Sequence, residues 1–324
     1  MLNYLVKRIF TLIPILLGIT VISFLILHLT PGEPTDLQTQ LNPRATAEVR
    51  ERLRTFYGLD HPLHVQYLNW LKRFGRMDFG ESFSTDHRPV IDKIGERLPI
   101  TIAISGLALL LTLILAIPAG LLSALKPGSL FDRALTSFSF LGFAAPSFFV
   151  ALLLIILFGL KLGWLPISGI HSIFYSQLSA PAKFLDLARH LLLPIFVITF
   201  GSVAFFALFL RGSFLEVYHQ DFITTARAKG VPERNVVLHH TLRNALLPLI
   251  TNLGLSIPSL IGGSVILESI FAIPGMGQLF YTSVMARDYP VIMGILVIGA
   301  MLTLLGNLLA DLGYALADPR IRAR

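Results

Sequence analysis

Six stretches of the chain contain no aspartate, glutamate, lysine or arginine, and each is long enough to cross a lipid bilayer. A transmembrane helix needs about 20 mainly apolar residues to span roughly 30 Å of hydrocarbon. The whole chain is poor in charge, because 14% of its 324 residues are charged, against about 25% in a soluble domain. The sequence therefore predicts an all-α polytopic membrane protein with six transmembrane helices. These are expected at residues 9–32, 98–125, 134–160, 190–210, 244–267 and 289–310.

The basic residues predict the orientation of these helices. Because six is an even number, both termini lie on one side, and cytoplasmic loops are enriched in lysine and arginine. With the termini inside, the cytoplasmic segments contain twelve basic residues: Lys7, Arg8, Lys126, Arg133, Arg211, Arg227, Lys229, Arg234, Arg243, Arg320, Arg322 and Arg324. The short outer loops contain four: Lys161, Lys183, Arg189 and Arg287. We therefore expect cytoplasmic termini, and this asymmetry explains the net charge of +7 better than nucleic-acid binding does.

The same pattern divides the chain into three parts. Residues 1–30 form an N-terminal transmembrane helix, residues 31–97 an extracytoplasmic segment, and residues 98–324 a five-helix core with a cytoplasmic loop at 211–248. Within the extracytoplasmic segment, apolar residues at helical spacing predict two short helices, at 44–57 and 64–74, each followed by a glycine. The segment is too small for a separate enzyme domain, so we expect a cap on the outer mouth or a surface for a partner.

Two residues are candidates for the wall of a passage across the membrane. Pro146 lies inside the third span, where a proline removes a backbone hydrogen bond and neighbouring helices or a cavity must compensate. It marks either a kink that lines the passage or a kink that serves packing. Glu268 follows the fifth span, where an acidic residue faces either the headgroup region or a water-filled path.

The longest polar segment of the C-terminal two-thirds, residues 221–248, is expected to form a small structure of its own. Residues 221–229 are compatible with a helix that Gly230 ends, and Pro232 followed by Glu233 suits the first turn of a second helix. The result is a helix, a glycine turn and a helix at the inner membrane surface. Such a unit can fit a groove on a cytoplasmic partner, or it can rest on anionic lipid as a basic amphipathic segment.

Several kinds of chemistry are missing from the sequence. The chain has no cysteine and no Walker A, H-E-x-x-H or G-x-S-x-G motif, so it is not expected to be an enzyme. No metal site is expected, because His61, His64 and His87 fit no metal-binding spacing, and the adjacent His239 and His240 point about 100° apart on a helix. Charged residues are nearly absent from the spans, although a proton-coupled carrier needs buried ionisable groups. The energy for transport therefore comes from another protein, or the chain is a passive pore.

Two neighbouring motifs resemble the EAA loop of ABC importer permeases. They are Thr224-Thr225-Ala226-Arg227-Ala228-Lys229-Gly230 and Arg243-Asn244-Ala245-Leu246-Leu247-Pro248. Thr224-Thr225-Ala226 stands where the general pattern has Glu-Ala-Ala, and the longer spacing to Leu247-Pro248 is similar to that of the dipeptide/oligopeptide/nickel branch. Further segments resemble signatures of the B-type permease subunit: Pro31-Gly32-Glu33-Pro34, Leu162-Gly163-Trp164-Leu165-Pro166, Phe271-Ala272-Ile273-Pro274-Gly275-Met276-Gly277, Arg287-Asp288-Tyr289-Pro290 and Asp318-Pro319-Arg320-Ile321-Arg322.

The resemblance implies a type I ABC importer permease fold and half of a translocation path in the plasma (inner) membrane of a prokaryote. Besides membrane lipid, it implies three kinds of partner: a homologous second permease, two ABC ATPase subunits and an extracytoplasmic substrate-binding protein. The ATPases would bind ATP and Mg, so no cofactor is expected on this chain. Their grooves would receive a coupling loop formed by Asp221, Thr224, Thr225, Ala226, Arg227, Ala228, Lys229, Gly230, Arg243, Asn244, Leu247 and Pro248.

Dipeptides or oligopeptides are the cargo that the resemblance implies first, while nickel, glutathione and other small solutes stay open. An ATP-independent secondary transporter or channel is the alternative from a different class, and it predicts uptake that does not depend on ATPase subunits. A membrane enzyme is a more distant alternative, because it would need a catalytic constellation that the sequence does not show.

Overall fold

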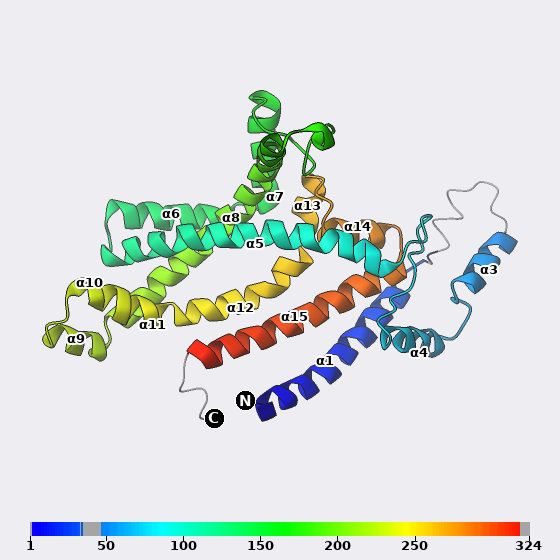
Figure 1. The fold of residues 1–324 in the computed structure, drawn as a ribbon, viewed down its shortest axis with the longest axis horizontal. Helices are drawn as coiled ribbons and strands as arrows, with labels where there is room; N and C mark the ends of the chain where they lie inside the picture. The colour runs from blue at the N-terminus through cyan, green and yellow to red at the C-terminus, as the bar shows by residue number, and fades with distance from the viewer. Residues whose placement is uncertain (1, 33, 35–46, 318–324) are drawn as a thin grey trace.

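The computed structural model describes residues 2–32, 34 and 47–317, and helices dominate this part of the chain (Figure 1). Glu81 and Pro89 form an isolated β-bridge, and the described residues contain no named strand. Five segments of the described residues are long and apolar enough to cross a membrane: Phe10–Leu29, Val90–Leu125, Ala180–Tyr218, Glu233–Ile270 and Tyr289–Leu308. They contain most or all of α1 (Leu2–Leu29), α5 (Val90–Leu125), α8 (Ala180–Tyr218), α12 (Leu247–Gly262) and α15 (Tyr289–Ala317). The predicted all-α class is confirmed.

The third predicted span, residues 134–160, is a bent pair of helices. α6 (Leu130–Ala144) and the segment Ser147–Lys161 meet at 98°, and this segment consists of α7 (Ser147–Leu154) and the π-helix η1 (Ile155–Lys161). Pro146 lies at the corner, because a proline disfavours helical backbone in the residue before it. Accordingly, Ala145 is extended, with φ −83° and ψ 115°. Counted as one span, the pair brings the total to six, as the sequence predicted.

Two spans extend well beyond the uncharged stretches from which they were predicted. α5 begins at Val90 rather than at residue 98, and α8 runs from Ala180 to Tyr218 rather than from 190 to 210. Each uncharged stretch ends at the first charged side chain, whereas a helix continues for as long as its backbone hydrogen bonds do. The predicted boundary at residue 97 therefore falls inside α5.

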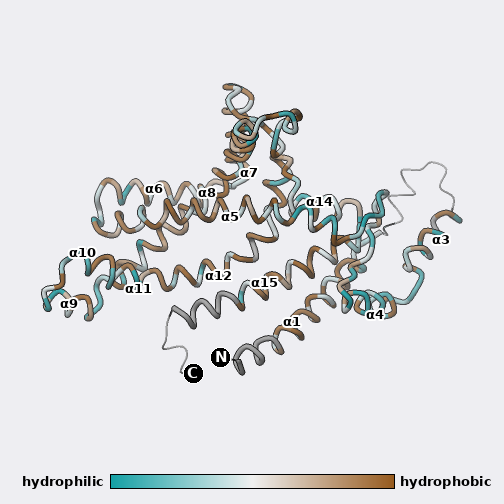
Figure 2. The backbone as a smooth tube through the Cα atoms, in the orientation of Figure 1, coloured by the Kyte–Doolittle hydropathy of each residue, from teal (hydrophilic) through white to brown (hydrophobic). Residues whose placement is uncertain are grey.

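The helices run mostly along the long axis of the molecule, and its two ends are the polar parts (Figures 1 and 2). One end holds α9 (Asp221–Ala228) and α10 (Glu233–Asn235), and the opposite end holds α3 (Ala47–Phe56) and α4 (Leu63–Phe74). α1 and α15 lie side by side and antiparallel, so the start of α1 and the end of α15 both point toward the α9 end. An apolar band between polar ends is what a bilayer-spanning protein requires.

The two short helices predicted between the first and second spans are present. α4 agrees with the predicted helix at 64–74, and α3 lies within the one predicted at 44–57, of which residues 44–46 lie outside the described part. Glu33 and residues 318–324, which include the last predicted signature and three of the basic residues used for orientation, also lie outside it.

Side chains at the α4 end connect α1, α4 and α15. The hydroxyls of Tyr67 on α4 and Thr20 on α1 are 2.9 Å apart. Next to α15, the buried Asp288 accepts hydrogen bonds from Ser82 Oγ, from the Phe83 N–H over 3.0 Å and from Ser84 Oγ over 2.9 Å. The chain between α4 and α5 is thereby held against the start of α15.

Small residues let α5 and α8 approach each other closely, as in other packed membrane helices. Ala108 and Ala116 of α5 are buried, as are Ala204 and Ala207 of α8. A Cβ atom on Gly120 would lie 2.6 Å from the carbonyl oxygen of Ala207, so a larger residue would push the helices apart. This closely packed pair is the centre against which α6 and α12 pack.

An ion pair between a half-buried arginine and a buried aspartate joins α6 to α8. Arg211 donates from Nε to Oδ1 of Asp132 over 2.6 Å and from Nη2 to Oδ2 over 3.0 Å. Ser123 Oγ and the Gly128 N–H donate to the same carboxylate over 2.5 and 2.7 Å. Asp132 is only 4% exposed, and a buried charge is strongly destabilising once its partner is removed.

Candidate functional site

The segment that connects α8 to α12, residues 219–246, is a compact unit that we call the α9 loop. It contains α9, a turn at Lys229 and Gly230, α10, the π-helix η3 (Val236–Leu242) and α11 (Arg243–Ala245). Gly230 has a φ of +76°, a left-handed conformation that favours glycine. The predicted arrangement of helix, glycine turn and helix is confirmed.

The α9 loop has a small core of its own. Ile223, Ala226 and Val236 are buried against one another, and the half-buried Val231 packs on them. The cluster therefore holds α9 against the start of η3, so the loop is a folded unit rather than a flexible connection.

A polar network closes the joint between α9 and α10. Arg227 donates to Glu233 from Nε over 3.2 Å and from Nη2 over 2.9 Å, and Tyr218 Oη donates to the same carboxylate over 3.0 Å. The Arg227 guanidinium also lies 4.3 Å from the centre of the Tyr218 ring. Because the Glu233 carboxylate accepts its hydrogen bonds, the pKa of Arg227 is raised. Tyr218 belongs to α8, so the network links the α9 loop to a membrane-spanning helix.

The structure places the twelve predicted coupling residues in two groups. Asp221, Thr224, Thr225, Ala226, Arg227 and Ala228 lie in α9, and Lys229 and Gly230 form its turn, whereas Arg243 and Asn244 lie in α11, and Leu247 and Pro248 begin α12. Nine are exposed, Arg227 and Leu247 are half-buried, and Ala226 is buried in the loop core. Ala226 therefore serves the fold of the loop, while most of the others are available to a partner.

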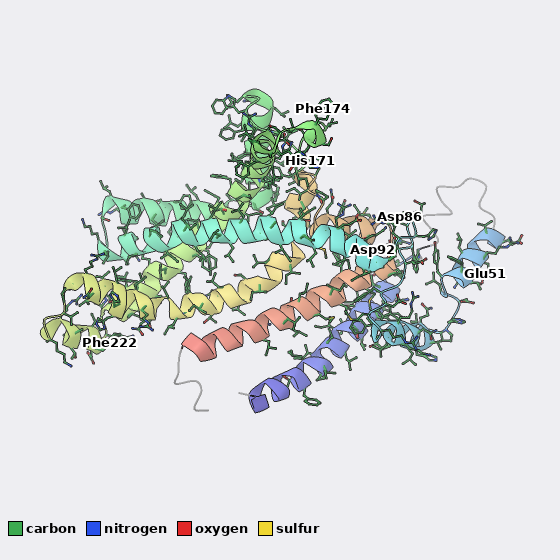
Figure 3. The ribbon with its side chains drawn as sticks, in the orientation of Figure 1. Glu51, Asp86, Asp92, His171, Phe174 and Phe222 are labelled. Atoms are coloured by element: carbon green, nitrogen blue, oxygen red, sulfur yellow. The ribbon has the colours of Figure 1, made fainter. Side chains whose placement is uncertain are left out.

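The structure draws attention to two residues that the sequence does not single out, Tyr218 and Phe222, and to Glu233, which the sequence predicts only in the first turn of the second helix. Tyr218 and Glu233 close its joint, and Phe222 is a large apolar side chain that is 42% exposed on α9. Phe222 lies at the opposite end of the molecule from Asp86 and Asp92 (Figure 3). An aromatic residue directly after Asp221 at the start of a polar helix was the available signal.

Glu268 lies in α13 (Val265–Ile270) and is buried, with 6% of its surface exposed. Its Oε1 accepts a hydrogen bond from Thr101 Oγ1 over 3.1 Å, and its Oε2 accepts one from the N–H of Gln278 over 2.9 Å. Thr101 Oγ1 in turn accepts from the Met276 N–H over 2.8 Å. The carboxylate thus lies at the N-terminus of α14 (Met276–Met285), where negative charge is favourable. The carboxylate therefore points into the protein rather than toward its surface.

Glycines make room for this carboxylate. A Cβ atom on Gly263 would lie 2.2 Å from Glu268 Oε1, and one on Gly275 would lie 2.5 Å from Oε2. Gly263 also has a φ of +65°, and it separates α12 from α13. The break between α12 and α13 therefore leaves room for the buried carboxylate of Glu268.

A cavity of about 340 Å³ lies between α5, α8, α12 and α13. Its polar lining consists of Thr101, Ser105, Ser147, Ser202, Ser256, Ser264 and Glu268, and the rest is mainly apolar. Pro146 is exposed at the corner of the bent pair, and the neighbouring Ser147 reaches the cavity. The two residues predicted for a passage thus lie at or next to one cavity. Among the described residues, no three His, Asp or Glu side chains are placed to hold a metal ion.

Comparisons with known proteins place the chain in a family. Residues 116–323 match the family "Binding-protein-dependent transport system inner membrane component", and residues 1–105 match "Binding-prot-dependent transport system membrane comp, N-term". The "Oligopeptide transport system permease protein AppB" of Bacillus subtilis is 44% identical over 318 residues, which are 98% of each chain. The "Oligopeptide transport system permease protein OppB" of Haemophilus influenzae is 36% identical over 322 residues, which are 99% of this chain and 100% of that protein.

A solved structure of the "MetNI methionine ABC transporter" in "inward facing conformations" has a similar fold. The TM-score is 0.54 at 17% identity, and the match covers 70% of this chain and 97% of the other. The predicted ABC importer permease fold is thereby confirmed.

The spans, the folded loop at one polar end and the cavity between the spans define a multi-pass membrane permease. The chain belongs to the family of inner membrane components of binding-protein-dependent transport systems, which are the permeases of ABC importers.

Proposed function

We propose that this chain is one of two homologous permease subunits in an ATP-driven importer of dipeptides and oligopeptides. Membership of the family supports the permease role. The cargo class is supported by relatives of 44% and 36% identity, both of which carry the name oligopeptide transport system permease protein. The second permease would complete the translocation path, and an extracytoplasmic binding protein would deliver the peptide.

The proposal that this subunit couples to ATPases rests on the α9 loop. It is a folded unit at one end of the molecule, and it exposes most of the residues that resemble the EAA loop. We assign it to the cytoplasmic side, because Lys126, Arg133 and Arg211 lie at the same end of α5, α6 and α8. The α3–α4 end would then face the binding protein. Two partner ATPases would hold ATP and Mg and receive the loop in surface grooves.

The contacts of the loop suggest how a movement would reach the membrane. Tyr218 of α8 bonds to Glu233, and Ser213 Oγ of α8 donates to the carbonyl oxygen of Ala245 over 2.9 Å. At its other end the loop continues through α11 into α12. When ATP binding closes the ATPases, a displaced loop would therefore move α8 and α12. Both helices line the cavity next to Pro146 and Glu268, which we propose as part of the path.

Reconstitution of the subunit with its co-purified partners tests this function. Vesicles should accumulate a labelled dipeptide or oligopeptide when ATP is supplied, and they should lose this uptake with catalytically inactive ATPase subunits. Uptake that continues with inactive ATPases would indicate a secondary transporter or channel. ATP-dependent uptake of nickel or glutathione without uptake of peptide would refute the proposed cargo and retain the coupling mechanism.

A further inference from the structure

Hydroxyl groups from five different elements converge on the cavity. Ser105 comes from α5, Ser147 begins α7, Ser202 comes from α8, Ser256 from α12, and Ser264 is the N-cap of α13. These elements are far apart in the sequence, and their remaining side chains are mostly apolar. The tertiary fold therefore brings together hydroxyl groups that are far apart in the sequence.

The local bonding of these serines determines what they can offer to a ligand. Ser202 Oγ donates to the carbonyl oxygen of Ile198 over 2.9 Å, and Ser256 Oγ donates to that of Asn252 over 2.8 Å. A hydroxyl has one proton and two lone pairs. With their protons used inside their own helices, Ser202 and Ser256 present acceptors to the cavity, and such acceptors suit N–H groups.

Among the described residues that line the cavity, Glu268 is the one ionisable residue, and its two oxygens are already engaged. Thr101 donates to one of them and the N–H of Gln278 to the other, and the side chain is 6% exposed. Its charge faces the N-terminus of α14, which favours a negative group. The cavity thus combines acceptor hydroxyls and apolar surface without a charge that is free to select acidic or basic cargo.

We propose that this cavity contacts the peptide during passage, and that Ser202 and Ser256 accept hydrogen bonds from its backbone N–H groups. This inference rests on the proposed function, and it names the groups that cargo touches. Every peptide carries backbone N–H groups whatever its side chains, so these contacts tolerate varied sequences. A volume of about 340 Å³ is near the lower end of ligand sites, at roughly 300–1,000 Å³. The cavity therefore holds a short piece of an extended peptide.

Cysteine labelling tests whether peptide enters the cavity. The chain contains no cysteine, so Ser202→Cys and Ser256→Cys each introduce a single thiol into this subunit. The reconstituted transporter is treated with a membrane-impermeant maleimide, and labelling of this subunit is followed with and without peptide and ATP. We expect both thiols to react, and transported peptide to slow the reaction several-fold. Ser176→Cys is the control, because Ser176 is exposed in the short helix η2 (Tyr175–Gln177), outside the candidate spans, and does not line the cavity.

N-methylated peptides test the chemistry of the contact. Replacing single backbone N–H groups by N–CH₃ should lower kcat/KM for uptake by wild type roughly 5-fold, the effect of losing one ordinary hydrogen bond. The Ser202→Ala/Ser256→Ala double variant should lose most of this discrimination, while Ser176→Ala retains it. Comparing the variants with the same binding protein cancels the binding protein's own preference. Basal ATP hydrolysis by the partner ATPases shows that each variant assembles.

The outcomes separate this inference from the proposed function. Uptake of peptide by wild type, without protection of either thiol and with unchanged discrimination in the double variant, would overturn the inference alone. Absence of ATP-dependent peptide uptake by wild type would overturn the proposed function and the inference together. Equal protection of the Ser176→Cys control would show a general conformational effect, and it would also overturn the inference.

Discussion

Gly230→Val is the sharpest perturbation of the α9 loop. Gly230 has a φ of +76°, and nothing lies within 4 Å of the position that a Cβ atom would occupy. The substitution therefore causes no collision, and its cost is the backbone strain of a left-handed residue, roughly 1–2 kcal/mol. Valine belongs at the upper end of this range, because its branched side chain restricts the backbone further. A cost of this size lowers the population of the native turn about 5- to 30-fold relative to any competing conformation.

Relaxation of the turn would disturb the contacts on both sides of it. The Gly230 N–H donates to the carbonyl oxygen of Arg227 over 2.9 Å, and the Val231 N–H donates to that of Ala226 over 3.2 Å. If the backbone leaves the left-handed region, Val231 moves out of the loop core, and Arg227 separates from Glu233. The loop then no longer transmits displacement as one body.

The assay compares ATP hydrolysis with peptide uptake in the same vesicles. We expect Gly230→Val to keep ATP hydrolysis and to lose most of the uptake per ATP. Gly230→Asn should retain coupling, because asparagine tolerates the left-handed conformation. Gly163→Val is the matched control, since Gly163 has a φ of +63° and no atom within 4 Å of a Cβ, but lies after η1 and outside the α9 loop. Normal ATP-driven uptake by Gly230→Val would refute the reasoning, as would an equal loss of uptake per ATP in Gly163→Val.

Four further predictions concern the membrane-spanning part. Glu268→Gln should change the kinetics of uptake if Glu268 belongs to the path, whereas unchanged kinetics would restrict this residue to capping α14. Glu268→Ala should lower the free energy of unfolding by about 1–3 kcal/mol in detergent, because it leaves buried donors without an acceptor; an unshifted thermal transition would contradict the hydrogen-bond assignment. Arg211→Met should cost about 3–5 kcal/mol because Asp132 stays buried without its partner, and this is checked by thermal unfolding, where native stability would argue against the ion pair. Pro146→Ala should allow α6 to continue into α7, so ATP-dependent uptake should fall at normal membrane levels of the subunit; unchanged uptake would leave Pro146 a packing kink.

The helices and the α9 turn could be predicted because their causes are local. A span is predicted wherever a stretch without charged residues is long enough to cross the hydrocarbon. The structure shows spans at all six predicted places, with the bent pair counted as one. Gly230 ends α9 because a left-handed turn favours a residue without a Cβ, and the next helix follows Pro232. The helix at the predicted division begins at Val90 rather than at residue 98, since charged residues end an uncharged stretch but not a helix.

The surroundings of Glu268 could not be predicted from its position at the end of an apolar run. Its hydrogen-bond donors are Thr101, far earlier in the chain, and Gln278, beyond a loop. Nothing local distinguishes an acid at a membrane surface from one that caps a buried helix. The difference arises from Gly263, which follows α12, and Gly275, which precedes α14, because both let the backbone come close to the carboxylate.

The sequence by itself determined the class of the protein, the number of spans and the folded loop between the fourth and fifth, because each follows from solvation or backbone conformation within a short segment. Only the tertiary structure decided that the third span turns by 98° at Pro146, and that serines from five elements meet in one cavity. Those features depend on how closely helices distant in sequence approach one another. That approach is set by pairs of small residues and buried donors, such as Gly120 against Ala207 and Arg211 against Asp132.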